Sequence, residues 1–554
     1  MDNTRLFLYA ALAFVSLLIW EQWNADYGPK PAAVEQTAAT AAPADAARQR
    51  PDATNAGDLP ELEASSTPDA VPENRNAVAQ GVLIRVETDV VEAVIDSRGG
   101  VIRSFKLKKY PVDVDHPDEY LELLFQRKDE LHVLQNGLRS ADSPAPTHYD
   151  PFTAPQTEYR LADGSDELRV PLRWEKDGIE VVKTYVFHRG DYRVNLEHLV
   201  RNNSELPWKG SEYRQITRSR PLKTSRLLYT YTGAVVYNEE IKYEKVKFDD
   251  MEEQPLRMES TGGWVAMLQH YFLSAIVAEP EEKVLFYTLA NIRQYPKTYT
   301  VGMKTAAMSI EPGQTATFSS ELFVGPKLVQ RLEEIAPGLE LTVDYGVLTF
   351  LSKPMAWYLT WLKNLVGNWG LAIILLTLTV KLLFFKLSET SYKSMARMRK
   401  LTPRLKALKE RYGDDRQRMN QAMMDLYKEE KVNPMGGCLP MVVQIPIFIA
   451  LYWSLLENVE LRQATFLWIK DLSAMDPYYI LPILMGASML IQQKLNPAPT
   501  DPMQAKVMMV LPLVFSVFFA FFPAGLVLYW VVNNVLSIAQ QWIITRRIES
   551  GEEK

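Results

Sequence analysis

Long apolar runs divide this chain into a mostly polar part and a mostly apolar part. Residues 25–345 mix polar and apolar positions, whereas residues 346–544 hold nearly all of the long apolar stretches. A helix needs about 20 apolar residues to cross roughly 30 Å of hydrocarbon. The pattern therefore predicts a polytopic α-helical membrane protein with six spans and a large additional domain. The predicted spans lie within residues 1–24, 369–387, 438–456, 478–492, 506–523 and 525–544.

The first apolar run predicts a membrane anchor at the N-terminus. Residues Leu6–Trp20 are largely apolar, and no small-x-small cleavage site follows them. An uncleaved anchor over residues 1–24 is therefore favoured over a cleaved signal peptide. Residues 25–80 are rich in Ala, Pro, Thr and Asp and poor in large apolar residues. Such a segment buries too little apolar surface to offset its ordering entropy, which predicts a flexible linker.

Alternating positions predict a β-sandwich domain over residues 81–345. Tyr192, Val194 and Leu196 alternate with polar residues after a turn, and similar short strands recur along this region. All six histidines lie here, but none has zinc-ligand spacing with another histidine or with the single cysteine, Cys438. We therefore expect no metal, no cofactor and no intramolecular disulfide, and we interpret the histidines as surface or core residues.

The distribution of basic residues predicts the orientation in the membrane. Residues 388–437 contain 12 Lys and Arg, whereas the 457–477 loop contains only Arg462 and Lys470. Cytoplasmic loops carry the Lys and Arg excess, so both termini, including the tail 545–554, are expected in the cytoplasm. The β-rich domain would then lie in the periplasm. The net charge of −6 is small for this length and gives no reason to expect DNA binding.

Two amphipathic segments flank the second predicted span. Residues 346–368 place Met355, Leu359 and Leu362 at helical spacing, which predicts a helix lying in the membrane interface. A helix packed on the β-rich domain is the alternative. Residues 388–437 predict a cytoplasmic helical hairpin with a methionine-rich apolar stripe. Methionines suit varied apolar partners, and the basic residues suit anionic lipid headgroups or ribosomal RNA.

Polar residues inside the predicted spans are the candidate functional residues. Lys381 lies twelve residues into the second span, where an ionisable residue usually faces a bundle interior or a water-filled cavity. The alternative is that Lys381 snorkels to the headgroups. In the last span, polar side chains recur every four residues from Tyr529 to Gln541. They either hold the bundle together by hydrogen bonds or line a wet groove centred on Lys381. The candidate groove residues are Lys381, Thr377, Gln444, Tyr529, Trp530, Asn533 and Asn534.

Four sequence tracts carry a resemblance to a known family. They are Asn433–Pro440, Gln444–Phe448, Asp476–Pro482 and Phe522–Tyr529. Together with the anchor, the β-rich domain and the interfacial helix, they cover essentially the whole chain. The chain resembles the YidC/Oxa/Alb family of bacterial membrane protein insertases in its Gram-negative form. The resemblance implies a periplasmic supersandwich of the galactose-mutarotase type, followed by five core spans.

The resemblance also implies a function, which is that of an insertase and chaperone rather than an enzyme. Such a protein moves small proteins, its clients, from the cytoplasm into the inner membrane through a polar groove open to cytoplasm and lipid. Lys381 would attract acidic residues of the client. The family typically has an arginine at this position, and lysine keeps the charge but lacks the planar fork. The implied partners are nascent membrane proteins, the Sec translocon, the ribosome, the signal recognition particle pathway and the lipid bilayer.

Two other functions are compatible with parts of the sequence. A secondary transporter also has polar residues within spans, but this chain shows no internal repeat. A membrane-tethered periplasmic carbohydrate-acting enzyme would suit a mutarotase-like domain, but the sequence reveals no cluster of catalytic carboxylate and histidine, and fold analogy alone does not confer activity. The sequence contains no G-x-x-x-x-G-K-[ST] motif. Partition into lipid and the membrane potential would therefore drive insertion.

Overall fold

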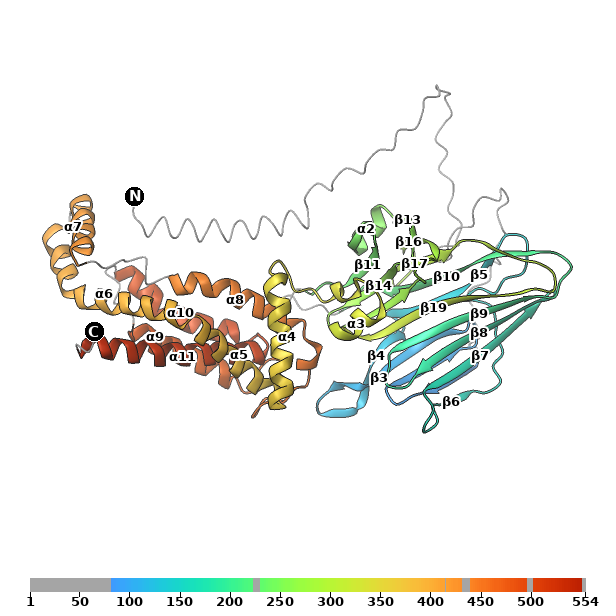
Figure 1. Ribbon diagram of the computed structural model, residues 1–554, viewed down its shortest axis with the longest axis horizontal. Helices are drawn as coiled ribbons and strands as arrows, with labels where there is room; N and C mark the ends of the chain where they lie inside the picture. Colours follow the sequence, from blue (N-terminus) through green and yellow to red (C-terminus); the bar gives the residue numbers. More distant parts are fainter. Residues whose placement is uncertain (1–80, 223–229, 414, 431–438, 496–501, 551–554) are drawn as a thin grey trace, which may run out of the picture. The chain divides into compact units, whose positions relative to one another are not determined.

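The structure of this chain, a computed structural model, has a β-rich part followed by a helical part (Figure 1). It describes residues 81–222, 230–413, 415–430, 439–495 and 502–550. The predicted anchor (residues 1–24) and linker (residues 25–80) lie outside the described residues, as do Cys438 and the last four residues of the tail.

Two β-sheets form the domain predicted for residues 81–345. In spatial order, the first sheet contains β13 (Arg257–Thr261), β16 (Lys283–Asn291), β17 (Thr298–Thr305), β10 (Trp208–Ser219), β5 (Leu131–Ser140), β4 (His116–Gln126), β3 (Val101–Asp113), β2 (Val91–Asp96), β1 (Leu83–Glu87) and β6 (Glu158–Arg160), and β18 (Met308–Ile310) pairs with β10. The second sheet contains β12 (Lys242–Val246), β11 (Gly233–Asn238), β14 (Trp264–Gln269), β15 (Phe272–Val277), β19 (Thr315–Pro326), β9 (Arg193–Asn202), β8 (Ile179–His188) and β7 (Glu167–Lys176).

The period-two pattern of the strands explains how the two sheets pack. In β9, Val194, Leu196, His198 and Val200 are buried, whereas the residues that alternate with them are half-buried or exposed. The three apolar side chains join one apolar cluster with residues of the first sheet, such as Phe105 and Ile216. Because successive side chains of a strand point to opposite faces, one face of each sheet faces the core. The prediction of a β-sandwich is confirmed.

A charged network lies at the centre of this sandwich. Glu212 accepts hydrogen bonds from His198 Nδ1 (2.7 Å) and Arg214 Nε (2.7 Å), and all three side chains are fully buried. Arg214 also pairs with Glu282 at 2.8 Å. Burial by itself raises the pKa of Glu212, but Arg214 and His198 outweigh it and lower that pKa to about 2. The interior therefore holds ionised groups that depend on one another.

We predict that Glu212→Gln destabilises the sandwich by about 3–5 kcal/mol, because it leaves a buried guanidinium without its nearer carboxylate. Since the pKa of Glu212 is depressed when folded, this stabilisation is present above about pH 4.5 and is lost as the pH falls toward 2. The difference in unfolding free energy between the variant and the parent should shrink as the pH falls over that range. Hydrogen exchange of sandwich peptides in the full chain measures it. Glu239→Gln, which breaks a largely exposed pair with Lys242, should leave exchange unchanged.

The helices follow the sandwich, except for α2, which lies within it. They are α2 (Phe248–Glu253), α3 (Val329–Ile335), η1 (Leu339–Thr342), α4 (Thr349–Val366), α5 (Trp369–Leu383), α6 (Phe385–Tyr412), α7 (Arg416–Glu429), α8 (Leu439–Leu456), η3 (Val459–Leu461), α9 (Ile480–Leu495), α10 (Pro502–Phe519) and α11 (Ala524–Glu549).

Local sequence explains where the first of these helices end and begin. α4 ends at Gly367, whose φ of 72° is readily accessible only to glycine, and Asn368 then caps α5 by accepting a hydrogen bond from the Leu371 amide. α5 ends at Leu383, so the predicted span 369–387 does not continue as one straight helix. The chain bends by 68° before α6.

α4 has two apolar faces rather than one. Leu359 and Leu362 pack among the helices, and Ala356 joins the core of the sandwich. On the opposite side, Trp357 and Trp361 are exposed. The helix therefore packs on the sandwich and on other helices and also presents an aromatic face, and its location in a membrane interface stays a prediction.

Among the described residues, one helical stretch, Ala524–Arg547, is long and apolar enough to cross a membrane. A second qualifies if α5 and the first part of α6 are taken as one bent span. The apolar parts of α8, α9 and α10 are shorter, and the predicted count of six spans is not confirmed. A helix of 18 residues such as α8 extends about 27 Å, slightly less than the hydrocarbon thickness.

Candidate functional site

A small pocket with both polar and apolar side chains in its wall lies between α5, α6, α8 and α11. We call it the Lys381 pocket, and its volume is about 20 Å³, which is room for roughly one water molecule. α5, α6, α8 and α11 each contribute to its wall. The lining residues are Val380, Lys381, Phe384, Leu387, Ser388, Val443, Gln444, Ile447 and Asn533.

Lys381 lies in the last turn of α5, and its amine is directed toward α11. The Nζ atom donates a hydrogen bond to Ser537 Oγ (2.8 Å), and the Ser537 hydroxyl donates in turn to the Asn533 carbonyl (2.7 Å). The lysine side chain is partly buried. Among the described residues, no carboxylate forms an ion pair with it. The pocket therefore contains a positive charge that is held by a neutral hydroxyl.

α8 and α11 meet at a direct contact between two amides. Gln444 Nε2 donates to Asn533 Oδ1 at 2.6 Å, and both residues line the Lys381 pocket. The stripe on α11 is buried along its length, with Tyr529, Asn533, Ser537 and Gln541 all less than a tenth exposed. The four-residue spacing thus places one polar face of α11 against its neighbours.

The other predicted groove residues lie outside the Lys381 pocket. The Thr377 hydroxyl donates to the Ile373 carbonyl of its own helix (2.7 Å), although the residue is buried. Asn534 faces α9 and donates to Ser488 Oγ (3.1 Å). Trp530 stacks on Phe448 with ring centroids 4.1 Å apart.

Aromatic rings form an apolar wall beside the pocket. The Tyr529 ring lies 6.4 Å from the ring of Phe448, and Trp530 also contacts Phe519 edge-on at 4.0 Å. Such contacts fix the rotation of α11, because large rings pack in few orientations. Of the predicted residues, Lys381, Gln444 and Asn533 are therefore brought together, and the others support the helices around them.

Sequence reasoning missed Ser388 as a pocket residue and did not place Ser537 next to the lysine. Ser537 belongs to the predicted stripe, and its position four residues after Asn533 was a usable signal. Ser388 follows the bend between α5 and α6, and the direction of that bend has no signal in the residue spacing.

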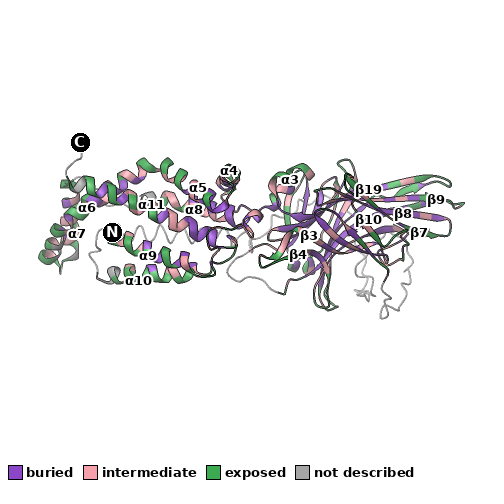
Figure 2. Ribbon diagram, turned by 90° about the horizontal axis from the view of Figure 1, so that it is seen from below, coloured by how far each residue is buried: buried purple, intermediate pink, exposed green. Residues whose placement is uncertain are grey.

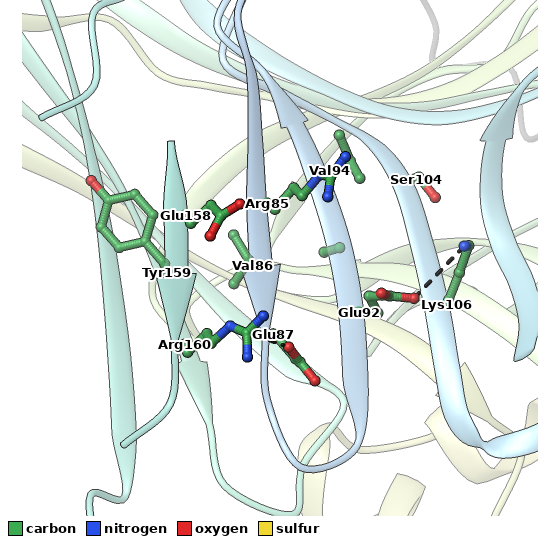
Figure 3. Close-up of a pocket in the computed structure, with 11 residues that line it drawn as sticks. Arg85, Val86, Glu87, Glu92, Val94, Ser104, Lys106, Glu158, Tyr159 and Arg160 are labelled. Atoms are coloured by element: carbon green, nitrogen blue, oxygen red, sulfur yellow. Dashed lines mark ion pairs between the residues drawn. The ribbon is translucent and has the colours of Figure 1, made fainter. Parts of the chain in front are cut away.

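A larger hollow lies on the sandwich, where β1, β2, β3 and β6 run side by side (Figure 3). Its volume is about 280 Å³, and charged side chains of both signs line it. These charges are paired across the strands, since Lys106 lies 3.7 Å from Glu92 and Glu87 contacts both Lys108 and Arg160. We interpret this hollow as a solvated sheet face. Within the described ranges, no group of three or more His, Cys, Asp or Glu side chains could hold a metal ion.

Comparison with known proteins gives matches over the whole chain. The family model described as 60Kd inner membrane protein matches residues 361–552, and the model described as YidC periplasmic domain matches residues 83–358. The membrane protein insertase YidC of Thioalkalivibrio sulfidiphilus is 52% identical, and the match covers 100% of both chains. The one from Nitrosococcus oceani is 50% identical over 99% of both chains.

Solved structures also align with the chain. An active YidC insertase with its first transmembrane domain resolved is 19% identical, with a TM-score of 0.39 over 84% of this chain and 94% of the other. A galactose mutarotase related enzyme from Lactobacillus acidophilus is 10% identical, with a TM-score of 0.30 over 44% of this chain and 97% of the other. With about half of all residues identical to full-length relatives, the chain belongs to the YidC family of membrane protein insertases.

Proposed function

We propose that this membrane protein insertase receives the hydrophilic segment of a client in the Lys381 pocket. The observation that carries the proposal is the amine of Lys381, which points into the helical bundle and has a hydroxyl rather than a carboxylate as its partner. In a low-dielectric setting, such a charge attracts an acidic side chain strongly. An acidic client residue would supply the counter-charge that the described residues do not.

The apolar outer surface of the helices supports a membrane setting for this pocket. Exposed residues run along α9 and α10 (Figure 2), and on α10 they include Met509, Leu513 and Val517, each more than half exposed. A helix with large apolar side chains exposed around its surface suits lipid rather than water. The Lys381 pocket would thus lie beside hydrocarbon, where it lowers the desolvation cost of a crossing polar segment.

The small size of the pocket defines the step that must precede binding. A volume of about 20 Å³ holds a water molecule but no peptide segment. Binding of a client therefore requires α8 and α11 to separate at the contact between Gln444 and Asn533. The client's acidic residue would then replace Ser537 as the partner of Lys381. Its apolar segment would move sideways into lipid, driven by hydrophobic transfer.

The topology predicted from the sequence places the other parts of the chain on either side of the membrane. In our proposal the six predicted spans place both termini and the hairpin of α6 and α7 in the cytoplasm, with the sandwich in the periplasm and α4 in the membrane interface. The two matching families, described as 60Kd inner membrane protein and YidC periplasmic domain, support an inner-membrane location and a periplasmic domain. The hairpin would contact anionic headgroups or the ribosome. The Sec translocon and the signal recognition particle pathway are further proposed partners.

Depletion of the protein tests the proposed function. Small inner-membrane proteins with short acidic translocated segments should accumulate uninserted in depleted cells, and the purified protein in liposomes should restore their insertion. A secondary transporter would leave insertion normal, as would a tethered carbohydrate-acting enzyme. Normal insertion after full depletion contradicts the proposal.

A further inference from the structure

The C-terminal end of α8 is held by residues of the β-rich domain. His270, in the turn between β14 and β15, donates from Nε2 to the Leu456 carbonyl oxygen (2.9 Å). A carbonyl can only accept, so this nitrogen carries the proton. The next residue, Glu457, accepts from Lys327 Nζ at 2.9 Å, and both side chains are only 4% exposed. Lys327 also donates to the Thr342 carbonyl (3.1 Å).

A buried ion pair at this junction imposes a specific geometry. Each ion costs several kcal/mol to bury, and the pair is tolerated only while both partners are in place. A second ion pair, between Lys470 and Asp115, joins the same two regions, but both side chains are 61% exposed. Such an exposed pair adds little, since water replaces either partner. The buried pair, together with the hydrogen bond from His270, therefore fixes where α8 ends.

α8 connects this junction to the Lys381 pocket. Gln444 lies thirteen residues before Glu457, which is about 20 Å along a helix. Between them, Phe448 stacks on Trp530, and the Ser454 hydroxyl donates to the Ser352 carbonyl of α4 (2.8 Å). A displacement of the end of α8 therefore changes the contact between Gln444 and α11.

We propose that Lys327 and Glu457 are positioning residues, whose buried ion pair fixes α8 so that Gln444 meets Asn533 in the Lys381 pocket. The inference rests on the proposed function of that pocket. It assigns a role in insertion to a pair of residues that touch neither the pocket nor the client. The link runs from the sandwich, through the end of one helix, to the site that receives the client.

The charges around Glu457 make the proposal testable by pH. Burial raises the pKa of Glu457, and Lys327 offsets only part of this effect. The titratable groups that act on Glu457 are Lys327, Lys245, Asp344, Tyr243, Tyr271, Tyr345 and Tyr452. Asp344 is itself paired with Lys245 at 2.6 Å. Without Lys327, the carboxyl of Glu457 should take up a proton more readily and become neutral in acid.

Two variants of the full-length protein in liposomes separate positioning from folding. At about pH 8, we expect Lys327→Met and Glu457→Gln each to slow insertion per folded molecule about fivefold or more, because each leaves an unpaired buried charge. In more acidic buffer, Lys327→Met should recover toward the parent rate, because burial raises the pKa of Glu457 and favours its neutral form. Glu457→Gln should not recover, because the glutamine offers Lys327 no carboxylate at either pH. Lys470→Met is the matched control and should match the parent at both pH values.

A labelling measurement reports on α8 without depending on insertion. In a Cys438→Ser and Val443→Cys background, which keeps Gln444 and labels a neighbouring residue of the pocket wall, both variants should increase the alkylation rate of the cysteine at position 443, whereas Lys470→Met should not. The proposal is overturned if both variants insert and label like the parent, or if acid relieves them equally. Reduced protein amounts with normal insertion and labelling per molecule also contradict it. Lys381→Ala in the same insertion assay tests the proposed function of the pocket separately. If Lys381→Ala does not slow insertion, that function is refuted, but the labelling result still tests whether the ion pair positions α8.

Discussion

Replacing Lys381 by alanine is expected to slow the insertion of clients with acidic translocated segments by about tenfold or more. Two opposite charges 4 Å apart attract each other by roughly 4 kcal/mol at an effective dielectric constant of 20. Loss of only about a third of that attraction corresponds to a tenfold change in rate. Because the amine faces Ser537 rather than a carboxylate, no described residue would supply the missing charge. Insertion into liposomes, measured by protease protection of the translocated segment, gives the rate directly.

The matched control for this experiment is Lys386→Ala. Lys386 lies five residues further along the chain, its side chain is 90% exposed, and it pairs with Glu389. Loss of a solvated charge outside the pocket should leave insertion within about twofold of the parent. Clients whose translocated segments lack acidic residues should also be unaffected by Lys381→Ala. Equal rates for Lys381→Ala and the parent with acidic clients would refute the proposed role of the charge.

Lys381→Arg should retain most of the insertion activity, because the Lys381 pocket requires the positive charge rather than a special chemistry of the amine. Lysine uses one donor toward Ser537, and an arginine has five donors in a wider, planar fork. The larger head must fit a pocket of about 20 Å³, so the tolerance of arginine measures how far the helices separate when a client binds. A loss as large as that of alanine would show that shape matters more than charge.

The sequence predicted the elements of this fold better than it predicted their contacts. Alternation along strands such as β9 identified the sandwich, because a period of two is imposed by the backbone itself. The boundary between α4 and α5 lies at Gly367 and Asn368, whose capping roles are local. The bend after Leu383 had no such local marker. It decides whether Ser388 reaches the Lys381 pocket, and it depends on packing against α11.

The sequence predicted the polar and charged character of the candidate site, but only some of the residues that line it. Neighbouring residues on a helix are about 100° apart, so Asn533 and Asn534 face different helices, and spacing alone does not say which one meets Lys381. The histidines show a second limit. They were interpreted as surface or core residues, which His198 confirms, but their partners were not predicted: His270 donates to the end of α8, and His198 pairs with Glu212. Both partners are distant in sequence or on another sheet, and no local pattern links them.

Removing most of residues 81–325 should leave insertion largely intact. α5 to α11, which form the Lys381 pocket, all follow this segment in the chain, and the predicted linker 25–80 would join the anchor to the remainder. The deletion also keeps Lys327 and Glu457. The ion pair that we propose to position α8 can therefore still form, and without the sandwich neither charge carries a burial penalty. Growth of a depletion strain that expresses the shortened protein at normal levels measures the outcome, and failure to grow would contradict this expectation.

Removing residues 395–428 should instead abolish insertion, and this deletion is the counterpart of the first. α6 packs on α11 through Ala396 and Ile544, so the loss of its middle frees the segment that places Ser388 in the wall of the pocket. Leu401, Leu405 and Leu426 hold α6 and α7 together, and that hairpin presents the basic surface predicted to meet headgroups or the ribosome. The same depletion strain is used, and an immunoblot checks that the shortened protein is present at normal levels. Normal growth with the hairpin deleted would refute the proposed role of the hairpin in insertion. It would also show that the pocket works without the middle of α6.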